Sequence, residues 1–260
     1  MRSVTITTDT AIPTNAFYNC SFLTEINIPD TATLFGEYAF YNCSEISEIN
    51  IPEGVTTIPN YAFADCDKFS EVMLSNTVET IGERAFQNCT GLEKVTLSQG
   101  TKVIKNYAFD NCTALTSVDL SSNLQTIGEY AFVDCAALTK VVVPDSVTTI
   151  EIGAFKGANN LESITLPFVG KTTEASKETS VFGYVFDYTT ITASKEPVEG
   201  AVQQYKDRTS NGYNTFDRYY HYYIPQTLRS VTITTDTAIP TNAFYNCSFL
   251  TEINIPDTAT

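Results

Sequence analysis

The chain has 260 residues, of which 43% are hydrophobic and 12% are aromatic, and it contains no tryptophan. It carries 30 acidic and 15 basic side chains, and this net charge of -15 argues against nucleic-acid or anionic-membrane partners, because phosphates are bound by basic stripes. The apolar content excludes disorder over the whole length, and no apolar run reaches the roughly 20 residues of a membrane span. The single histidine, His221, makes acid–base or zinc catalysis improbable, so we expect no enzyme activity.

Residues 1–167 contain seven full units of 22 to 23 residues and the strand of an eighth. An Ala-Phe pair closes each unit, and a cysteine follows its phenylalanine by three residues until Ala158 replaces the last one. These two columns of structural core residues include Phe40, Phe63, Phe86, Phe109 and Phe132, and Cys43, Cys66, Cys89, Cys112 and Cys135. Stacking the units would bury both columns in one continuous core.

Each unit begins with a strand pattern and ends with a helical pattern. In the unit that starts at Leu92, residues 94–97 alternate between polar and apolar, which is typical of a half-buried strand. Apolar residues from Ile104 to Cys112 then recur at spacings of 4, 1 and 3, which fits one or two helical turns with an apolar side. The sequence therefore predicts an α/β repeat solenoid.

The repeat L-x-x-V-x-L-P-x-x-V-x-x-I-G-x-x-A-F-x-x-C, as in IPEGVTTIPNYAFADC and VPDSVTTIEIGAF, resembles the BspA-type, or Treponema-type, leucine-rich repeat. The resemblance covers residues 1–167 and 228–260. It implies a right-handed leucine-rich-repeat stack, with parallel strands on the concave face and short helical turns on the convex face, interrupted by an aromatic-rich insert.

The same resemblance implies a non-enzymatic adhesion module of a repetitive protein that is displayed on the cell surface or secreted. Its partner would be a protein of a host or of a neighbouring cell. A purely structural spacer in a surface array is the alternative, because one scaffold hosts many functions. The first residues, MRSVTITTDT, lack the pattern of a signal peptide.

Two columns of the strand face should point to solvent, and they supply the candidate ligand-binding residues. One column contains Glu25, Glu48 and Glu71, and the other contains Asn27, Asn50 and Met73. Like charges on adjacent strands are unfavourable, so a cation or a basic partner would relieve their repulsion, although water, salt and Lys94 would do so as well.

The cysteines allow three interpretations: disulfides, a metal site or core packing. Parallel side chains of a stack do not converge as a disulfide requires, and zinc ligands come in closer clusters. We favour buried thiols, and we expect no metal or cofactor. Asparagines before the cysteines, such as Asn88 before Cys89, formally match glycosylation sites, but we interpret them as turn residues of the repeat.

Residues 168–227 break the period and form a Tyr-rich connecting insert with 8 of the 15 tyrosines. The insert has a net charge of -1, so the repeats carry about -14. Its possible aromatic patch consists of Tyr219, Tyr220, His221, Tyr222 and Tyr223. These rings would stack on sugars or anchor a protein, or they pack on the flank of the solenoid, which we favour. A glycan-active module is the least favoured alternative, because His221 has no identifiable nucleophile or metal ligand beside it.

Residues 228–260 start the next repeat block, and residues 229–260 are identical to residues 2–33. This identity predicts that the chain is a slice of a larger array, whose neighbouring repeat blocks are its partners. A full-length protein with a duplicated end is the alternative. Because a solenoid without capping repeats leaves its core open, we expect frayed or partner-covered ends.

Overall fold

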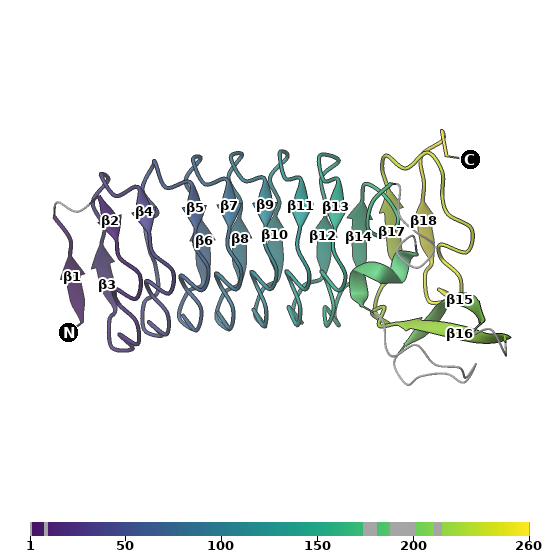
Figure 1. Cartoon of the computed structure of the whole chain (residues 1–260), viewed down its shortest axis with the longest axis horizontal. Helices are drawn as coiled ribbons and strands as arrows, with labels where there is room; N and C mark the ends of the chain where they lie inside the picture. Colours follow the sequence, from purple (N-terminus) through teal and green to yellow (C-terminus); the bar gives the residue numbers. More distant parts are fainter. Residues whose placement is uncertain (1, 8–9, 174–180, 188–200, 211–214, 260) are drawn as a thin grey trace.

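A computed structural model describes residues 2–7, 10–173, 181–187, 201–210 and 215–259, with the backbone alone for residues 205–210 and 215–219. These residues form an elongated, right-handed parallel β-solenoid of about nine turns, with the N-terminus and the C-terminus at opposite ends (Figure 1). The solenoid predicted from the repeat is therefore confirmed. Each turn of 22 to 23 residues is called a coil below.

One side of the stack is a column of short parallel strands, the strand face, whose strands pair in register within sheets of two, three and four strands. Ser3 of the first coil, for example, is opposite Glu25 of the second, and Glu71 is opposite Lys94. The strands are β1 (Ser3–Thr5), β3 (Glu25–Asn27), β6 (Glu71–Met73), β8 (Lys94–Thr96), β10 (Ser117–Asp119), β12 (Lys140–Val142), β14 (Ser163–Leu166), β17 (Ser230–Ile233) and β18 (Glu252–Asn254). Their central residues point inward and the flanking residues point outward, as in the exposed-buried-exposed pattern of β3 and β6.

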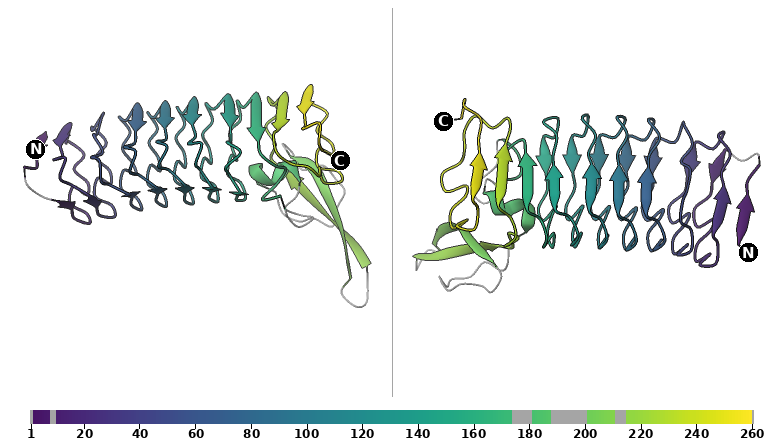
Figure 2. Two further views of the ribbon diagram at one scale, coloured as in Figure 1. Left: turned by 90° about the horizontal axis from the view of Figure 1, so that it is seen from above. Right: turned by 180° about the vertical axis from the view of Figure 1, so that it is seen from behind.

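A second column of two-residue strands runs along the opposite side of the stack, as the view from above in Figure 2 shows. It consists of β2 (Ala11–Ile12), β4 (Leu34–Phe35), β5 (Thr57–Ile58), β7 (Thr80–Ile81), β9 (Val103–Ile104), β11 (Thr126–Ile127) and β13 (Thr149–Ile150). From β5 to β13 the isoleucines pair with one another and are fully buried, so this column closes a second side of the core.

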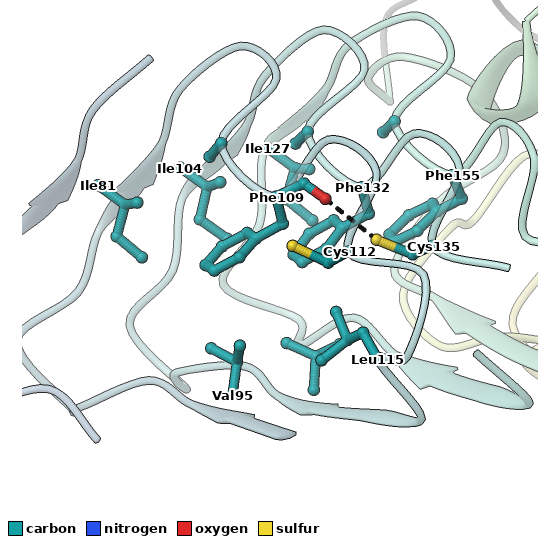
Figure 3. Close-up of a cluster of buried hydrophobic side chains, with 14 of the residues drawn as sticks. Ile81, Val95, Ile104, Phe109, Cys112, Leu115, Ile127, Phe132, Cys135 and Phe155 are labelled. Atoms are coloured by element: carbon teal, nitrogen blue, oxygen red, sulfur yellow. Dashed lines mark hydrogen bonds between the residues drawn. The ribbon is translucent and has the colours of Figure 1, made fainter. Parts of the chain in front are cut away.

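The core between the columns is a stack of parallel phenylalanine rings (Figure 3). Ring centroids of successive coils are 5.1 to 5.6 Å apart from Phe17 to Phe155, with interplanar angles of 1° to 15°. The alanine before each of these rings is fully buried from Ala39 to Ala154. Its small side chain allows the next coil to approach closely. Coils that each bury little alone thus share one continuous core.

The helical turns predicted for the convex face are wrong, because the Ala-Phe segments are irregular turns. From Arg84 to Cys89 the backbone amides alternate between acceptors in the next coil and acceptors in their own coil. Gln87 N donates to Arg84 O of its own coil at 3.2 Å, whereas Phe86 N donates to Ala108 O of the next coil at 2.8 Å. A helix would direct every amide back into its own segment, so the bonds that Arg84 N, Phe86 N and Asn88 N donate to the next coil would be lost.

Left-handed backbone at two positions per coil produces this alternation. Arg84 has φ of 52° and Asn88 has φ of 59°, and most coils repeat the pair at the same spacing of four residues. In the seventh coil both positions are glycines, Gly153 and Gly157, with φ of 64° and 76°. Residues with positive φ interrupt a right-handed helix, which explains why a helix-like spacing of apolar residues does not give a helix here.

The described part of the insert joins the seventh coil to the coil that starts at Leu228 and packs between these two coils. A 3-10 helix, η1 (Phe182–Phe186), is buried along its whole length, and Phe155 N donates to Val185 O as it would to the alanine of a next coil. An antiparallel hairpin of β15 (Val202–Ser210) and β16 (Thr215–Tyr222) follows, and it projects away from the solenoid (Figure 2). The chain then returns to the stack at β17.

Candidate functional site

The six candidate ligand-binding residues all lie exposed on the strand face near the N-terminal end. Glu25 and Asn27 are the first and last residues of β3, and Glu71 and Met73 are those of β6. Glu48 and Asn50 lie between them, in residues that are not assigned to a strand, and both are exposed. The inward central residues of the strands fix this alternation, so the outward side chains form two columns across successive coils.

Hydrogen bonds and an ion pair hold the carboxylates at the two ends of this strip. The Glu25 carboxylate accepts hydrogen bonds from Ser3 Oγ and Asn27 Nδ2, both at 3.3 Å. At the other end, Lys94 Nζ lies 3.8 Å from Glu71 Oε1. Exposed pairs at such distances contribute little stability, so the strip remains a negatively charged, solvated surface.

A cleft of about 470 Å³ opens beside this strip and has an acidic rim. Its lining residues are Asp30, Asn50, Ile51, Pro52, Glu53, Met73, Leu74 and Ser75. The structure therefore brings Asn50 and Met73 together in one cleft, while Glu25, Asn27, Glu48 and Glu71 lie outside it. Met73 is 68% exposed, so its flexible apolar side chain is available for contact with a partner.

The cysteine column belongs to the core, and its thiols act as hydrogen-bond donors. Cys89 Sγ donates to Phe63 O of the preceding coil at 3.2 Å, and Cys135 Sγ donates to Phe109 O at 3.2 Å (Figure 3). Burial raises the pKa of Cys43 to about 12 and the pKa of Cys66 well above its ordinary value. The thiols from Cys43 to Cys135 are buried, whereas Cys20 of the first coil is exposed.

A column of half-buried side chains on the turn side, here called the tyrosine stripe, was not among the predicted sites. It consists of Tyr38, Tyr61, Arg84, Tyr107 and Tyr130. Tyr38 stacks on Tyr61 with centroids 4.6 Å apart, and the Arg84 guanidinium lies 4.4 Å from the centroid of Tyr107. The signal was present in the sequence, because these residues recur every 23 positions, two residues before each core phenylalanine.

The stripe ends in a charged cluster at the foot of the hairpin. Lys156 Nζ lies 2.8 Å from Asp187 Oδ2 and 5.6 Å from the centroids of both Tyr130 and Tyr223. Burial, the Asp187 charge and a hydrogen bond to Asp187 together raise the pKa of Tyr130. A groove of about 430 Å³ next to this cluster includes Lys156 and Tyr223 in its lining.

The aromatic patch of the insert is largely inside the protein. Tyr220, His221 and Tyr222 are buried, Tyr223 is 37% exposed, and the side chain of Tyr219 lies outside the described residues. Burial lowers the pKa of His221, and neither ring nitrogen has a hydrogen-bond partner within the part of the chain that the structure describes. Tyr220 and Tyr222 therefore offer no free ring face to a sugar.

Gln204, which the sequence did not single out, holds the insert in place. Its buried side chain accepts a hydrogen bond from Gly183 N of η1 and donates to Ala243 O of the following coil at 3.1 Å. Gly183 is needed at this point because a Cβ there would lie 2.3 Å from Cβ of Tyr222. The insert thus packs through specific contacts with the stack.

Within the described ranges, no group of three His, Cys, Asp or Glu side chains is arranged to hold a metal ion. In that same part of the chain, no helix combines the length and the apolar character that a membrane crossing requires.

Comparisons with known proteins agree on the repeat. Residues 10–105, 79–196 and 209–260 match the family model described as a BspA type leucine rich repeat region (6 copies). The crystal structure of a leucine rich repeat protein of T. pallidum is similar at a TM-score of 0.57 and 25% identity, over 61% of this chain and 77% of that chain. A leucine-rich repeat protein of Eubacterium ventriosum is similar at 0.54 and 30% identity, over 60% of this chain and 43% of that chain. None of the curated proteins matches this chain.

Proposed function

Because this chain belongs to the family of BspA-type leucine-rich repeat proteins, we propose that it is a non-enzymatic module whose strand face binds a protein partner. The observation that carries the proposal is the strip of exposed Glu25, Glu48 and Glu71 beside the exposed Met73 and its acidic cleft. Repeat proteins of this kind are generally non-catalytic scaffolds that mediate protein–protein interaction.

The chemistry of the strip defines the kind of partner that would fit. A basic surface that carries an apolar side chain would pair with the carboxylates and cover Met73 in the same contact. Charge pairs at the rim of an interface mainly increase the association rate, and salt screens them. We therefore expect the association rate with such a partner to fall as the salt concentration rises.

Display on the cell surface, or secretion, and a role in adhesion belong to the same proposal. A surface-exposed array of this family would present the strand face to proteins of a host or of a neighbouring cell. The elongated stack in Figure 1 also supports a second candidate, a structural spacer that holds another domain away from its attachment point.

Charge reversal on the strand face separates the two candidates. We expect the chain to bind at least one protein on an array of purified extracellular proteins, and Glu25→Lys, Glu48→Lys and Glu71→Lys together to weaken that binding at least about tenfold, or about 1.4 kcal/mol. The matched control reverses three exposed glutamates outside the strip, Glu45, Glu129 and Glu162, and should leave binding unchanged. Equal losses in both triple variants, or no binding by the original chain, would favour the spacer.

A further inference from the structure

The groove of about 430 Å³ beside Lys156 lies within the stack, between the seventh coil and the segment that returns from the insert. Part of its lining comes from the sixth and seventh coils, and the other part is the return segment, residues 223–227. The coil residues are Asp134, Lys156, Gly157 and Asn159. This groove, here called the junction groove, is within the range of roughly 300–1,000 Å³ that is typical of small-ligand sites.

A missing side chain at Gly157 opens the junction groove. In the fourth and fifth coils, the residue before the cysteine donates a side-chain hydrogen bond to the coil before it. Asn88 Nδ2 donates to Asp65 Oδ1 at 2.7 Å, and Asn111 Nδ2 donates to Asn88 Oδ1 at 2.9 Å. The sixth coil has Asp134 at this position and the seventh has Gly157, where a Cβ would lie 2.1 Å from Asp134 Oδ1. Within the described residues, the exposed Asp134 carboxylate therefore receives no hydrogen bond from a side chain of the next coil.

The return segment adds an aromatic ring and apolar side chains to the lining. Tyr223 is 37% exposed, and Ile224 and Pro225, which follow it, are buried. Among the side chains of the aromatic patch that the structure describes, the Tyr223 ring is the one at the surface. The junction groove thus combines an aromatic and apolar part with a polar part that offers carboxylate, ammonium and amide groups.

Buried contacts hold the two parts of the lining together. The Asp187 carboxylate lies 2.8 Å from Lys156 Nζ, and Asp187 O accepts a hydrogen bond from Tyr223 N at 3.0 Å. Asp187 is only 6% exposed, so this connection lies inside the protein. Thr227 Oγ1 donates to Asn159 O at 2.9 Å and so fixes the far end of the return segment. Because the groove is formed without a ligand, little conformational entropy is lost when one binds.

From this combination we propose that the junction groove binds a neutral carbohydrate. A sugar ring has an apolar face of C–H groups and a rim of hydroxyls that both donate and accept hydrogen bonds. The C–H face packs on the exposed Tyr223 ring, whose area is apolar and rigid. The Asp134 carboxylate accepts hydrogen bonds from hydroxyls, and such charge-assisted bonds are the stronger kind. The amides of Asn159 and Gln226 donate and accept the remaining ones.

Other classes of ligand fit the junction groove less well. The net charge of -15 and the Asp134 carboxylate disfavour a sulfated or carboxylated sugar. None of the lining residues belongs to a strand, so an extended peptide would find no sheet edge with which to pair. The proposal concerns binding without turnover, and it does not depend on the protein-binding role of the strand face.

An array of immobilised ligands tests the proposal with the whole chain. The array carries neutral oligosaccharides, sulfated and sialylated glycans, and peptides, and we expect the chain to bind neutral oligosaccharides. Titration calorimetry with the oligosaccharide that gives the strongest signal then measures the dissociation constant. Binding to the anionic glycans alone, to the peptides alone or to none of these ligands would show that the proposal is wrong.

Two aspartates of the same column provide a matched pair of variants. Asp134→Asn removes the carboxylate from the junction groove and should weaken binding of the oligosaccharide at least about tenfold. Asp65→Asn makes the same change at the same position of the third coil, outside the groove, and should leave the dissociation constant unchanged. Equal losses in both variants would mean that the effect is non-specific and would refute the site.

Substitutions at Gly157 and Tyr223 give the second readout. Gly157→Asn supplies the side chain that the fourth and fifth coils have at this position, and asparagine tolerates its φ of 76°. The variant should therefore keep its fold, which thermal unfolding checks, and should lose binding because the new side chain occupies the groove. Tyr223→Ala should weaken binding about tenfold, whereas Tyr223→Phe retains the ring and should retain most of the affinity. Unchanged affinity in the folded Gly157→Asn and Tyr223→Ala variants would overturn the proposal.

Discussion

Each enclosed cysteine of the core both fills a small apolar space and donates a hydrogen bond. Cys66 Sγ donates to Phe40 O at 3.2 Å, so the thiol satisfies a buried carbonyl of the preceding coil. The sequence predicted buried thiols from their spacing, but not this bond, because the acceptor lies 26 residues earlier in the chain. Such a contact depends on how coils stack, which a pattern within one repeat does not contain.

The buried thiols make the free energy of unfolding depend on pH in the alkaline range. Burial raises the pKa of Cys43 from its ordinary value of 9.0 to about 12, and it also raises the pKa values of Cys66, Cys89 and Cys112. The folded state keeps these thiols protonated, whereas the unfolded chain loses their protons once the pH exceeds about 9. The free energy of unfolding should therefore be independent of these groups below that pH and should fall as the pH rises toward 12.

Urea unfolding under reducing conditions at a series of alkaline pH values measures this dependence. The double variant Cys66→Ala with Cys89→Ala should be less stable at neutral pH and should lose less stability on going to high pH. Cys20→Ala is the control, because Cys20 is exposed and its removal should leave the slope unchanged. An equal slope in the double variant would show that the core thiols are not responsible.

At the scale of the structural element, the Ala-Phe turn is defined by its left-handed residues. Asn88 has φ of 59°, and its Nδ2 donates to Asp65 Oδ1 at 2.7 Å while its Oδ1 accepts from Asn111 Nδ2 at 2.9 Å. The asparagine or aspartate before each cysteine thus has a backbone conformation that it tolerates well, and Asn88 adds side-chain hydrogen bonds to both neighbouring coils.

Two substitutions at Asn88 distinguish the contribution of its left-handed backbone to stability from that of its side-chain hydrogen bonds. Asn88→Gly keeps the left-handed conformation and loses only the side-chain hydrogen bonds, so we expect a loss of about 1 kcal/mol in the free energy of unfolding. Asn88→Ala loses the same bonds and also places a Cβ in that conformation, which adds about 1–2 kcal/mol. Chemical denaturation of both variants measures the difference. If alanine is no worse than glycine, the left-handed turn does not limit stability.

The strand half of each repeat could be predicted from sequence, and the turn half could not. Polar and apolar alternation around Val95 is a local property that specifies a strand with one buried face. The spacing of Ile104, Phe109 and Cys112 fits a helix and the observed turn equally well, because it indicates only which side chains face the core. The left-handed residues that exclude the helix include Tyr107, and nothing in an isolated tyrosine signals that conformation.

At the scale of the whole molecule, the stacking of the coils determines which side chains are exposed to a partner. The exposed positions of the candidate residues follow from the strand alternation, whereas the cleft at Met73 depends on how residues 50–53 and 73–75 of adjacent coils lie together. Buried Tyr220 and Tyr222 pack the insert against the stack and leave their rings closed to a ligand. The exposed glutamates and Met73 therefore remain the surface on which the proposed function depends.

Site-specific photo-cross-linking to the protein found on the array tests that function most directly. The photoreactive residue p-benzoyl-L-phenylalanine would replace Met73 on the strand face, or Glu45 on the turn side as the control, since both positions are exposed. We expect a covalent adduct from position 73 that disappears in the background of the Glu25→Lys, Glu48→Lys and Glu71→Lys variant, and no adduct from position 45. Adducts of equal yield from both positions would contradict a partner bound on the strand face.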